Sequence, residues 1–334
     1  MSGATSRIMK LNAWLSWPPP EGAAATRVRV VCYNEWNHAV ILLIALAKRL
    51  FPDSLQVELV TVEGHAGEND EREIAGLESG LWDVALDTLT SKVLAARDRG
   101  APVVIVGARR KTHSFLLFGQ KGMISVKELR GKKVIACSPG DEMDIQSRQV
   151  LRDHGLEPGH AVEICYGGLL HNIFAMEEAF KRGEGEALIA TLPQGEKLKA
   201  EGYPVLADIG KLYPPRHDRV MAAREAFVRS RREALKALLS GIVRANRYFL
   251  DRTHRDEIIS IVRESEIFSH DHDQKVFDGI FEALYGRVPD SPLLEAAMIT
   301  PLLEEEYAKG TVKNKLELKD VLRLGPLEEA LREL

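Results

Sequence analysis

The chain has 334 residues, of which 45% are hydrophobic and 28% are charged, a composition that excludes low-complexity, collagen-like and coiled-coil chains. A chain of this length is expected to form two domains or one domain with two lobes. The 45 Lys and Arg residues nearly balance the 49 Asp and Glu residues, giving a formal charge of −4. This balance argues against nucleic acid as a partner.

Residues 1–26 contain three consecutive prolines but no apolar core of a signal peptide, and they predict a flexible N-terminal tail. As written, the chain is expected to be cytoplasmic, or periplasmic if the true start lies upstream. No segment approaches the roughly 20 apolar residues of a membrane span, so no membrane insertion is expected. The three cysteines are far apart, which excludes a disulfide framework and favours a reducing compartment.

Residues 27–110 predict alternating strands and helices. The strands are expected at 27–32, 55–62, 82–86 and 102–107, and the helices at 37–50, 69–79 and 88–97. The last strand is wholly apolar, which is typical of a strand buried on both faces. Short connections between alternating elements predict a mainly parallel sheet with flanking helices, and hence an α/β lobe.

Residues 111–204 predict a second, inserted α/β lobe. Its strands are expected at 112–118, 133–137, 161–166 and 187–191, and its helices at 141–154, 169–181 and 193–200. The strands at 204–208 and 220–223 are expected to return to the first sheet, and the chain from 225 onward is predicted to be almost wholly helical. The first lobe would therefore comprise 27–110 and 205–334.

Several short segments resemble, in order and spacing, those of one family. They are GLESGLWDVA at 76–85, RGAPV at 99–103, VKELRGKKVI at 126–135, the Gly-Leu-x-Pro end of 151–158, and 303–327. On these segments the chain resembles the type II periplasmic-binding-protein fold. Within it, the chain is similar to the branch of nitrate, sulfonate and taurine binding proteins and of proteins that bind or make the thiamine pyrimidine precursor. The resemblance implies two lobes, a helical C-terminal region and a small-molecule ligand between the lobes.

Candidate ligand-binding residues follow the predicted strands, because ligands of parallel α/β sheets bind beyond the carboxyl ends of the strands. In the first lobe they are Asn34, Trp36, Asn37, His65, Asp87, Thr88 and Arg109. In the second lobe they are Ser138, Tyr166, Gly167, His171, Asn172, Pro193 and Gln194.

The chemistry of these residues leaves two interpretations open. Trp36 can stack on a flat ligand, and Arg109 can hold a carboxylate, sulfonate or sulfinate with two parallel hydrogen bonds. The family resemblance implies a tryptophan near position 36 and, in some members, a functional histidine near 65. Structural roles fit as well: Asn37, Asp87 or Thr88 as helix caps, and Arg109 as a solvated hinge residue.

A catalytic interpretation rests on Cys32, which with His65 would form a nucleophile–base pair. Desulfinases that share this fold are similar in having a Cys after the first strand, a His after the second and an Arg close by, a role for which Arg72 is the candidate. All three cysteines are predicted at strand ends facing the ligand. The alternative is that they are small buried core residues.

The sequence therefore predicts small-molecule binding between two lobes, with an organic anion or a flat heterocycle as ligand. The predicted context is ABC transport, with a permease as partner if the protein is exported. The alternative is a cytosolic desulfinase- or decarboxylase-like enzyme using Cys32 and His65. No motif indicates a cofactor, and the HDHD run at 270–273 is explained by helix capping without a metal.

Overall fold

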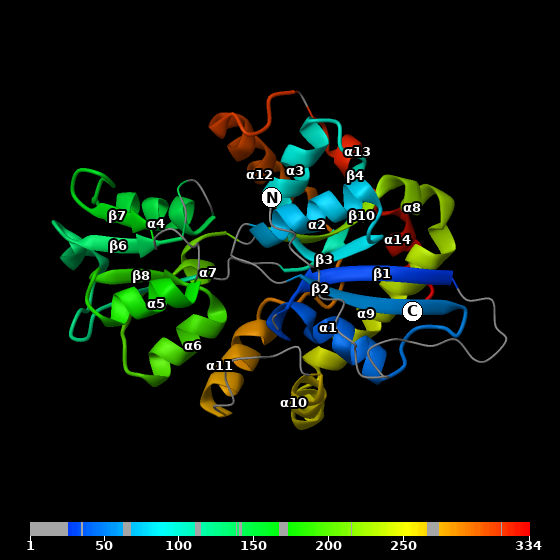
Figure 1. Ribbon diagram of the computed structural model, residues 1–334, viewed down its shortest axis with the longest axis horizontal. Helices are drawn as coiled ribbons and strands as arrows, with labels where there is room; N and C mark the ends of the chain where they lie inside the picture. The colour runs from blue at the N-terminus through cyan, green and yellow to red at the C-terminus, as the bar shows by residue number, and fades with distance from the viewer. Residues whose placement is uncertain are drawn as a thin grey trace, which may run out of the picture.

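The computed structural model describes residues 26–34, 36–62, 68–110, 115–137, 139, 142–166, 173–214, 216–265, 274–314 and 316–334. These residues form two five-stranded sheets, each flanked by helices, as two lobes side by side (Figure 1). The predicted two-lobed α/β architecture is thus present. Of the predicted tail, only Thr26 belongs to the described part, where it begins the first strand.

The first sheet has the strand order β2-β1-β3-β10-β4. Its strands are β1 (Thr26–Tyr33), β2 (Leu55–Val62), β3 (Val84–Leu89), β4 (Val103–Ala108) and β10 (Arg219–Arg224). β10 is antiparallel to both β3 and β4, and the other strands run in one direction. The carboxyl ends of β1 to β4 therefore meet at one edge of the sheet, where the chain leaves β4 for the second lobe.

Both faces of the first sheet are buried, because successive side chains of a strand point to opposite faces. Val30 joins the core beneath α1 (Trp36–Ala47) and α9 (Arg232–Leu250). The next residue, Val31, joins the core beneath α2 (Glu68–Ser79) and α3 (Thr90–Asp98). β3 continues to Leu89, so Asp87 and Thr88 lie within the strand, and α3 has no side-chain cap. Their predicted alternative role as helix caps is wrong.

The second sheet has the order β7-β6-β8-β5-β9. Its strands are β5 (Leu116–Gly119), β6 (Lys133–Ala136), β7 (Glu163–Tyr166), β8 (Ala187–Ala190) and β9 (Val205–Asp208). The flanking elements are the 3₁₀ helix η1 (Val126–Leu129), α4 (Glu142–Asp153), α5 (Ile173–Lys181), α6 (Leu192–Ala200) and α7 (Ile209–Leu212). β5 is antiparallel to β8 and β9.

One predicted strand belongs to a different sheet. The expectation that 204–208 returns to the first sheet is wrong, because β9 pairs with β5 and places Asp208 opposite Leu116. The local pattern identifies a strand here, but its partner depends on a contact with a segment about 90 residues away in the chain. The return to the first sheet occurs only at β10, as predicted for 220–223.

The chain after β10 is helical, as predicted, and it joins the two lobes. It contains α8 (Glu225–Ser230), α9, the 3₁₀ helix η2 (Arg252–His254), α10 (Arg255–Glu264), α11 (Gln274–Tyr285), α12 (Ala296–Lys309), α13 (Leu318–Val321) and α14 (Gly325–Arg332). α11 packs against α6 of the second lobe (Figure 1). Leu192 of α6 accordingly shares a hydrophobic core with Phe277 and Phe281 of α11. Among the described helices, none has the length and apolar character of a bilayer span.

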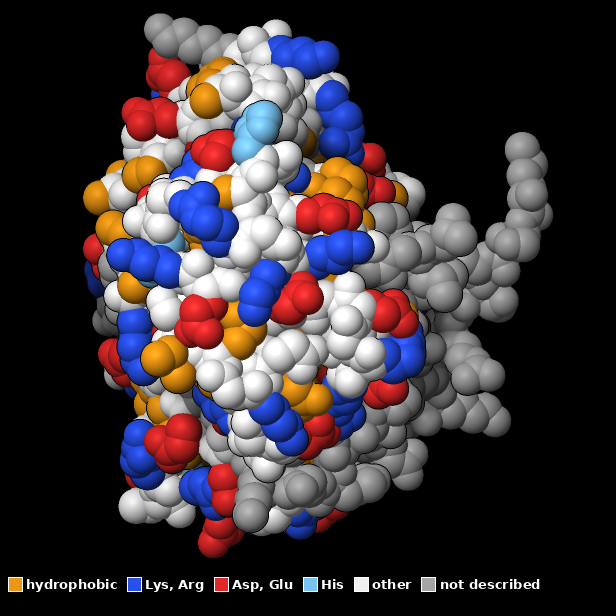
Figure 2. All heavy atoms as spheres, turned by 90° about the vertical axis from the view of Figure 1, so that its left-hand side faces the viewer, with side chains coloured by type: hydrophobic (Ala, Val, Ile, Leu, Met, Phe, Trp, Pro, Cys, Tyr) orange, Lys and Arg blue, Asp and Glu red, His pale blue; other side chains and the backbone are white. Residues whose placement is uncertain are grey.

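The outer face of the second lobe carries charges of both signs. Figure 2 shows lysine and arginine side chains interspersed with aspartate and glutamate over this face. Exposed pairs of this lobe include Arg152–Glu157 at 3.3 Å and Arg182–Glu184 at 2.6 Å. Such exposed pairs contribute little to stability, so the fold depends on its buried groups.

Glu225, the first residue of α8, joins three segments that are far apart in the sequence. Its carboxylate accepts hydrogen bonds from Arg97 of α3, Arg229 of α8 and Arg323 ahead of α14, each at 2.9 Å. Burial alone would raise the pKa of Glu225, but the three guanidinium groups outweigh it and lower the pKa to about 2. The ionised carboxylate therefore stabilises the packing of the C-terminal segment on the first sheet.

We expect Glu225→Gln to lower the free energy of unfolding at pH 7 by about 1–3 kcal/mol, the usual loss for a charged hydrogen-bond acceptor. A lowered pKa stabilises the fold above the ordinary carboxyl pKa, and this contribution is lost as the pH falls through the folded value. The difference between variant and wild type should therefore shrink between about pH 4.5 and pH 2. Urea unfolding over this pH range measures it, with the exposed Glu304→Gln as control. A difference that is independent of pH would contradict the assignment.

Candidate functional site

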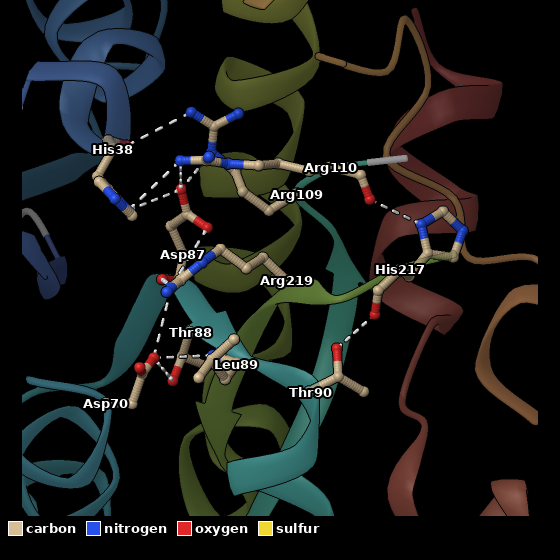
Figure 3. Close-up of polar contacts among 10 residues, drawn as sticks. All are labelled: His38, Asp70, Asp87, Thr88, Leu89, Thr90, Arg109, Arg110, His217 and Arg219. Carbon is tan, nitrogen blue, oxygen red and sulfur yellow. Dashed lines mark hydrogen bonds and ion pairs between the residues drawn. The ribbon is translucent and has the colours of Figure 1, made fainter. Parts of the chain in front are cut away.

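A buried cluster of charged side chains occupies the edge of the first sheet where β1, β3 and β4 end (Figure 3). Asp87 of β3 is fully buried, and Arg109 and Arg110, which follow β4, are each 2% exposed. The Asp87 Oδ2 atom accepts a hydrogen bond from Arg110 Nη2 at 2.8 Å and lies 3.7 Å from Arg109 Nε. It also lies 3.1 Å from His38 Nδ1 in the first turn of α1.

The same surroundings lower the pKa of both Asp87 and His38, so that the carboxyl group is charged and the imidazole is neutral. Burial alone would raise the pKa of Asp87, but Arg110, His38 and Arg109 outweigh it and hold the pKa well below its usual range. Burial lowers the pKa of His38 to about 3 despite the nearby carboxylate. We therefore assign His38 as neutral, with its Nδ1–H donating to Asp87. Asp87 is the anionic partner of the buried arginines, and ligand contact by Asp87 stays a prediction.

A second part of the cluster lies on the α2 side of the same strand ends. Arg219, the first residue of β10, donates from Nη1 to the backbone oxygen of Asp87 at 2.7 Å and lies 3.4 Å from Asp70 Oδ1. Asp70 of α2 also accepts from the backbone N–H of Leu89 at 2.9 Å and from the Thr88 hydroxyl at 3.4 Å. Thr88 is fully buried, and its hydroxyl joins β3 to α2; ligand contact by Thr88 stays a prediction.

Glu73, one turn after Asp70, is a fully buried carboxyl group that sequence reasoning missed. Neither of its oxygens accepts a hydrogen bond of good geometry from the described residues, although Thr88 lies near enough to influence it. Burial, followed by the negative charge of Asp70, raises the pKa of Glu73 well above its usual range. The sequence does contain a signal for the burial of Glu73. The spacing of Asp70, Glu73 and Leu77 places all three on one face of α2, and this face is buried.

His217 holds together the two chain segments that connect the lobes. It is fully buried, and its Nδ1 donates to the backbone oxygen of Arg110 at 3.0 Å, while Nε2 accepts from the backbone N–H of Glu295 at 3.3 Å. Its backbone oxygen accepts from the Thr90 hydroxyl at 2.5 Å (Figure 3). A lone histidine in a loop carries no sequence signal for this role, which depends on contacts with distant segments.

Arg109 retains unused hydrogen-bonding capacity. Its Nη2 donates to the backbone oxygen of His38 at 3.4 Å, but its Nε and Nη1 have no hydrogen-bond partner among the described residues. Burial lowers the pKa of Arg109 to about 10, so it still carries its charge at neutral pH. Nearby in the first turn of α1, Asn37 is 3% exposed, and its Oδ1 also lacks a partner. A buried guanidinium beside a helix N-terminus can hold an anionic group.

The other candidates of the first lobe lie at the expected edge. Asn34 follows β1, and Trp36 begins α1. Arg72 lies on α2 and is half-buried. His65 is outside the described residues.

Two second-lobe candidates have structural partners. The Tyr166 hydroxyl donates to Asp144 Oδ1 at 3.0 Å and accepts from Arg148 Nη2 at 2.7 Å. Gln194 caps α6 by accepting from the backbone N–H of Thr191 at 3.1 Å, with Pro193 in the same first turn. The other second-lobe candidates, Ser138, Gly167, His171 and Asn172, are outside the described residues. Ligand contact by these residues stays a prediction.

The cysteines lie at the predicted strand ends, but two of the three are buried rather than exposed. Cys32 and Cys137 are fully buried in the hydrophobic cores, so the expectation that they face the ligand is wrong for both. Burial raises the pKa of Cys32 well above its usual value, which keeps it a thiol at neutral pH. Cys165 is half-buried on β7, where its Sγ donates to Glu163 at 3.4 Å. Because the thiolate is the nucleophile, these observations weigh against catalysis by Cys32.

The chain matches one family model, and its fold is similar to that of several solved structures. A family model described as NMT1/THI5 like matches residues 40–254. The structure is similar to the periplasmic aliphatic sulphonate binding protein SsuA from Escherichia coli, at 17% identity and a TM-score of 0.69 over 90% of this chain and 92% of that one. It is similar to the periplasmic nitrate-binding protein NrtA from Synechocystis PCC 6803, at 17% identity and a TM-score of 0.69 over 95% and 90% of the two chains.

A mutant of DSZB in complex with biphenyl-2-sulfinic acid is also similar, at 13% identity and a TM-score of 0.66 over 92% of this chain and 99% of that one. The search of curated proteins found no match to the sequence. At these identities the solved structures establish a shared fold, and they confirm the predicted type II periplasmic-binding-protein fold. Two of them are periplasmic proteins, which does not support the expected cytoplasmic location.

Proposed function

Because this chain belongs to the NMT1/THI5-like family, we propose that it is a two-lobed binding protein that holds a small organic anion between its lobes. The lobes would divide where the chain passes from β4 to β5 and where it returns from α7 to β10. The likeness in fold to sulphonate-binding and nitrate-binding proteins supports this function. The observation on which the ligand class rests is the incomplete pairing of Arg109.

A buried guanidinium with unused N–H groups is unfavourable unless a partner satisfies it. Asp87 is shared between Arg109 and Arg110, and it lies closer to Arg110. An anionic group placed at Arg109 would accept hydrogen bonds from its Nη1 and Nε groups, which make none within the described part of the chain, and from the N-terminus of α1. The proposed ligand is accordingly a carboxylate, sulfonate or sulfinate, and Asn34, Trp36 and Asn37 are further candidate contacts.

In the transport version of this function, closure of the lobes on the ligand would create the form that docks on an ABC permease. This version places the protein outside the cytoplasm. The enzymatic alternative requires an activated Cys32, which its burial and raised pKa do not favour.

The test compares wild-type protein with Arg109→Met against four probes: ethanesulfonate, nitrate, benzenesulfinate and the neutral 4-amino-5-hydroxymethyl-2-methylpyrimidine. We expect at least one anion to bind by titration calorimetry, and we expect the variant to bind it about 10- to 100-fold more weakly, since charged hydrogen bonds contribute roughly 1.5–3 kcal/mol. Arg182→Met, which removes an arginine side chain that is 59% exposed, is the matched control.

The possible results separate the alternatives. Binding of the pyrimidine alone, or an unchanged affinity in Arg109→Met, would show that the ligand is not held as an anion at this site. Release of sulfite from benzenesulfinate, abolished by Cys32→Ala, would establish the enzymatic alternative instead.

A further inference from the structure

The second sheet has an open edge at β7. In the sheet β7 pairs with β6 alone, and α4 lies beside it (Figure 1). The backbone N–H of Glu163 donates to the backbone oxygen of Lys132 at 3.0 Å, so the backbone groups of Glu163 face β6. Because the backbone groups of successive strand residues point in opposite directions, those of Ile164 and Tyr166 face away from the sheet. No hydrogen bond joins these outward groups to a described residue.

The edge of the first sheet at β4 is closed by contrast. Leu322 forms a β-bridge with Ile105 of β4, and the backbone N–H of Arg323 donates to the backbone oxygen of Ile105 at 2.8 Å. An open strand edge is a template on which another extended chain can pair. β7 therefore offers pairing positions that the C-terminal segment covers at β4.

A groove of about 390 Å³ lies beside the open edge, and Ile164 forms part of its lining. This volume falls within the roughly 300–1,000 Å³ that is usual for ligand sites. Lys132, which precedes β6, and His160, which precedes β7, also line the groove. His160 is exposed and Lys132 is half-buried, and neither side chain makes a hydrogen bond or ion pair with a residue in the described part of the chain. The groove thus holds a cation and an imidazole that are available to an acidic group.

The other charged residues of the lining are already engaged. Arg148 of α4 pairs with Asp144 at 2.7 Å and with the Tyr166 hydroxyl at 2.7 Å. Glu163 is the acidic member of the lining, and its side chain is 62% exposed and lies 3.9 Å from Lys133. Successive side chains of a strand point to opposite faces, so the Glu163 side chain leaves β7 on the face opposite to that of its neighbour in the strand. The balance of charge around the groove is therefore positive.

We propose that the β7 edge and this groove form a docking site for an extended, acidic segment of a partner protein. The segment pairs its backbone with the outward groups of Ile164 and Tyr166, and it places a carboxylate at Lys132 and His160. Alternate side chains of an extended chain point to the same face, so acidic residues at every second position suit the groove. The site belongs to the second lobe alone and is independent of the ligand position at Arg109.

The experiment follows the backbone amide signals of the full-length, nitrogen-15-labelled protein by NMR during titration with defined probes. The probes are a six-residue peptide of alternating threonine and glutamate, the same peptide with lysine for glutamate, the glutamate peptide methylated at every backbone nitrogen, and glutarate as a small dianion. We expect the glutamate peptide to shift the amide signals of Ile164 and Tyr166 and to slow their exchange with water. The lysine peptide and the methylated peptide should bind about 5-fold more weakly or worse, because one lacks the charge and the other the backbone donors.

Two variants separate the backbone contribution from the charge contribution. Ile164→Pro removes an outward N–H group and leaves those that face β6, so it should lower the affinity for the glutamate peptide about 5-fold or more. Lys132→Glu should weaken the glutamate peptide by a similar factor and should now favour the lysine peptide. Lys211→Glu, at a side chain of the same lobe that is 85% exposed, is the matched control. If Ile164→Pro does not fold, Lys132→Glu and the methylated peptide carry the test.

Three results would overturn the docking site: no shift of the Ile164 signal at millimolar peptide, equal binding of the glutamate and lysine peptides, or equal binding of the methylated and unmethylated peptides. A shift by glutarate as large as that by the peptide would assign the groove to small anions instead. A dimer that forms without any peptide and is abolished by Ile164→Pro would assign the edge to a second copy of the chain. Either assignment would replace the proposed partner segment.

Discussion

Asp87→Asn should lower the free energy of unfolding by about 3–5 kcal/mol, the usual loss when one partner of a buried ion pair is removed. The substitution preserves the volume of the side chain but removes the one charge shared by Arg109 and Arg110, which are each 2% exposed. Two guanidinium groups would then be buried with too little negative charge. Chemical denaturation at pH 7 measures the loss, with the exposed Asp53→Asn as control.

A second substitution tests the reason for this loss. Arg110→Met in the Asp87→Asn background should recover part of the stability, because it removes the cation that lies closest to the missing carboxylate, at 2.8 Å. A loss below about 1 kcal/mol in Asp87→Asn, the range of ordinary surface changes, would contradict the role of Asp87 as the counter-ion of the cluster. So would a double variant in which the two losses simply add.

Glu73→Gln should stabilise the protein at neutral pH and make its stability less dependent on pH. Burial and the negative charge of Asp70 raise the pKa of Glu73 well above the ordinary value for a glutamate side chain. For a carboxyl with a raised pKa, the unfolded chain releases the proton first, so stability is lost as the pH rises above the unfolded value. Each pH unit over which Glu73 stays protonated in the folded protein while the unfolded chain is ionised costs about 1.4 kcal/mol, so we expect the gain of the variant over wild type to grow as the pH rises towards 7.

The measurement is the free energy of unfolding of wild type and variant between pH 5 and pH 8, analysed as their difference. Burial raises the pKa of Asp218 to about 6, so Asp218 also makes the protein less stable as the pH rises. Taking the difference between variant and wild type removes this contribution, because both proteins contain Asp218. Glu71→Gln on the same helix, where the side chain is 67% exposed, is the control. Parallel curves for Glu73→Gln and wild type would mean that Glu73 is ionised in the folded protein.

Asp87 and Glu73 show how the same functional group acquires opposite properties within one cluster. Both are fully buried. Asp87 faces arginines from the β4 side, and they keep it charged. Glu73 faces Asp70 on its own helix, and the repulsion favours the neutral form. The buried edge thus combines a carboxyl group whose pKa is lowered, a carboxyl group whose pKa is raised, and an arginine, Arg109, whose Nε and Nη1 lack hydrogen-bond partners among the described residues.

Local pattern was sufficient to predict most of the fold. The apolar run of β4 predicts burial on both faces, and all six of its residues are buried. The short parallel strands of the second lobe are found within a residue or two of their predicted positions. The sequence did not predict that β9 pairs with β5. The residue pattern of a short strand does not specify which sheet it joins, because its partner depends on contacts with distant segments.

The sequence predicted where the candidate site lies, but not the charge and exposure of its residues. Because parallel strands end at a common edge, the sequence alone predicted that Asp87 and Arg109 lie together, and the structure places them 3.7 Å apart. The sequence did not show that Asp87 is a buried counter-ion or that Cys32 lies in the core. Charge state and exposure depend on what packs against a residue, and His217, for example, acquires its hydrogen-bond partners from Arg110 and Glu295, which are distant in the chain.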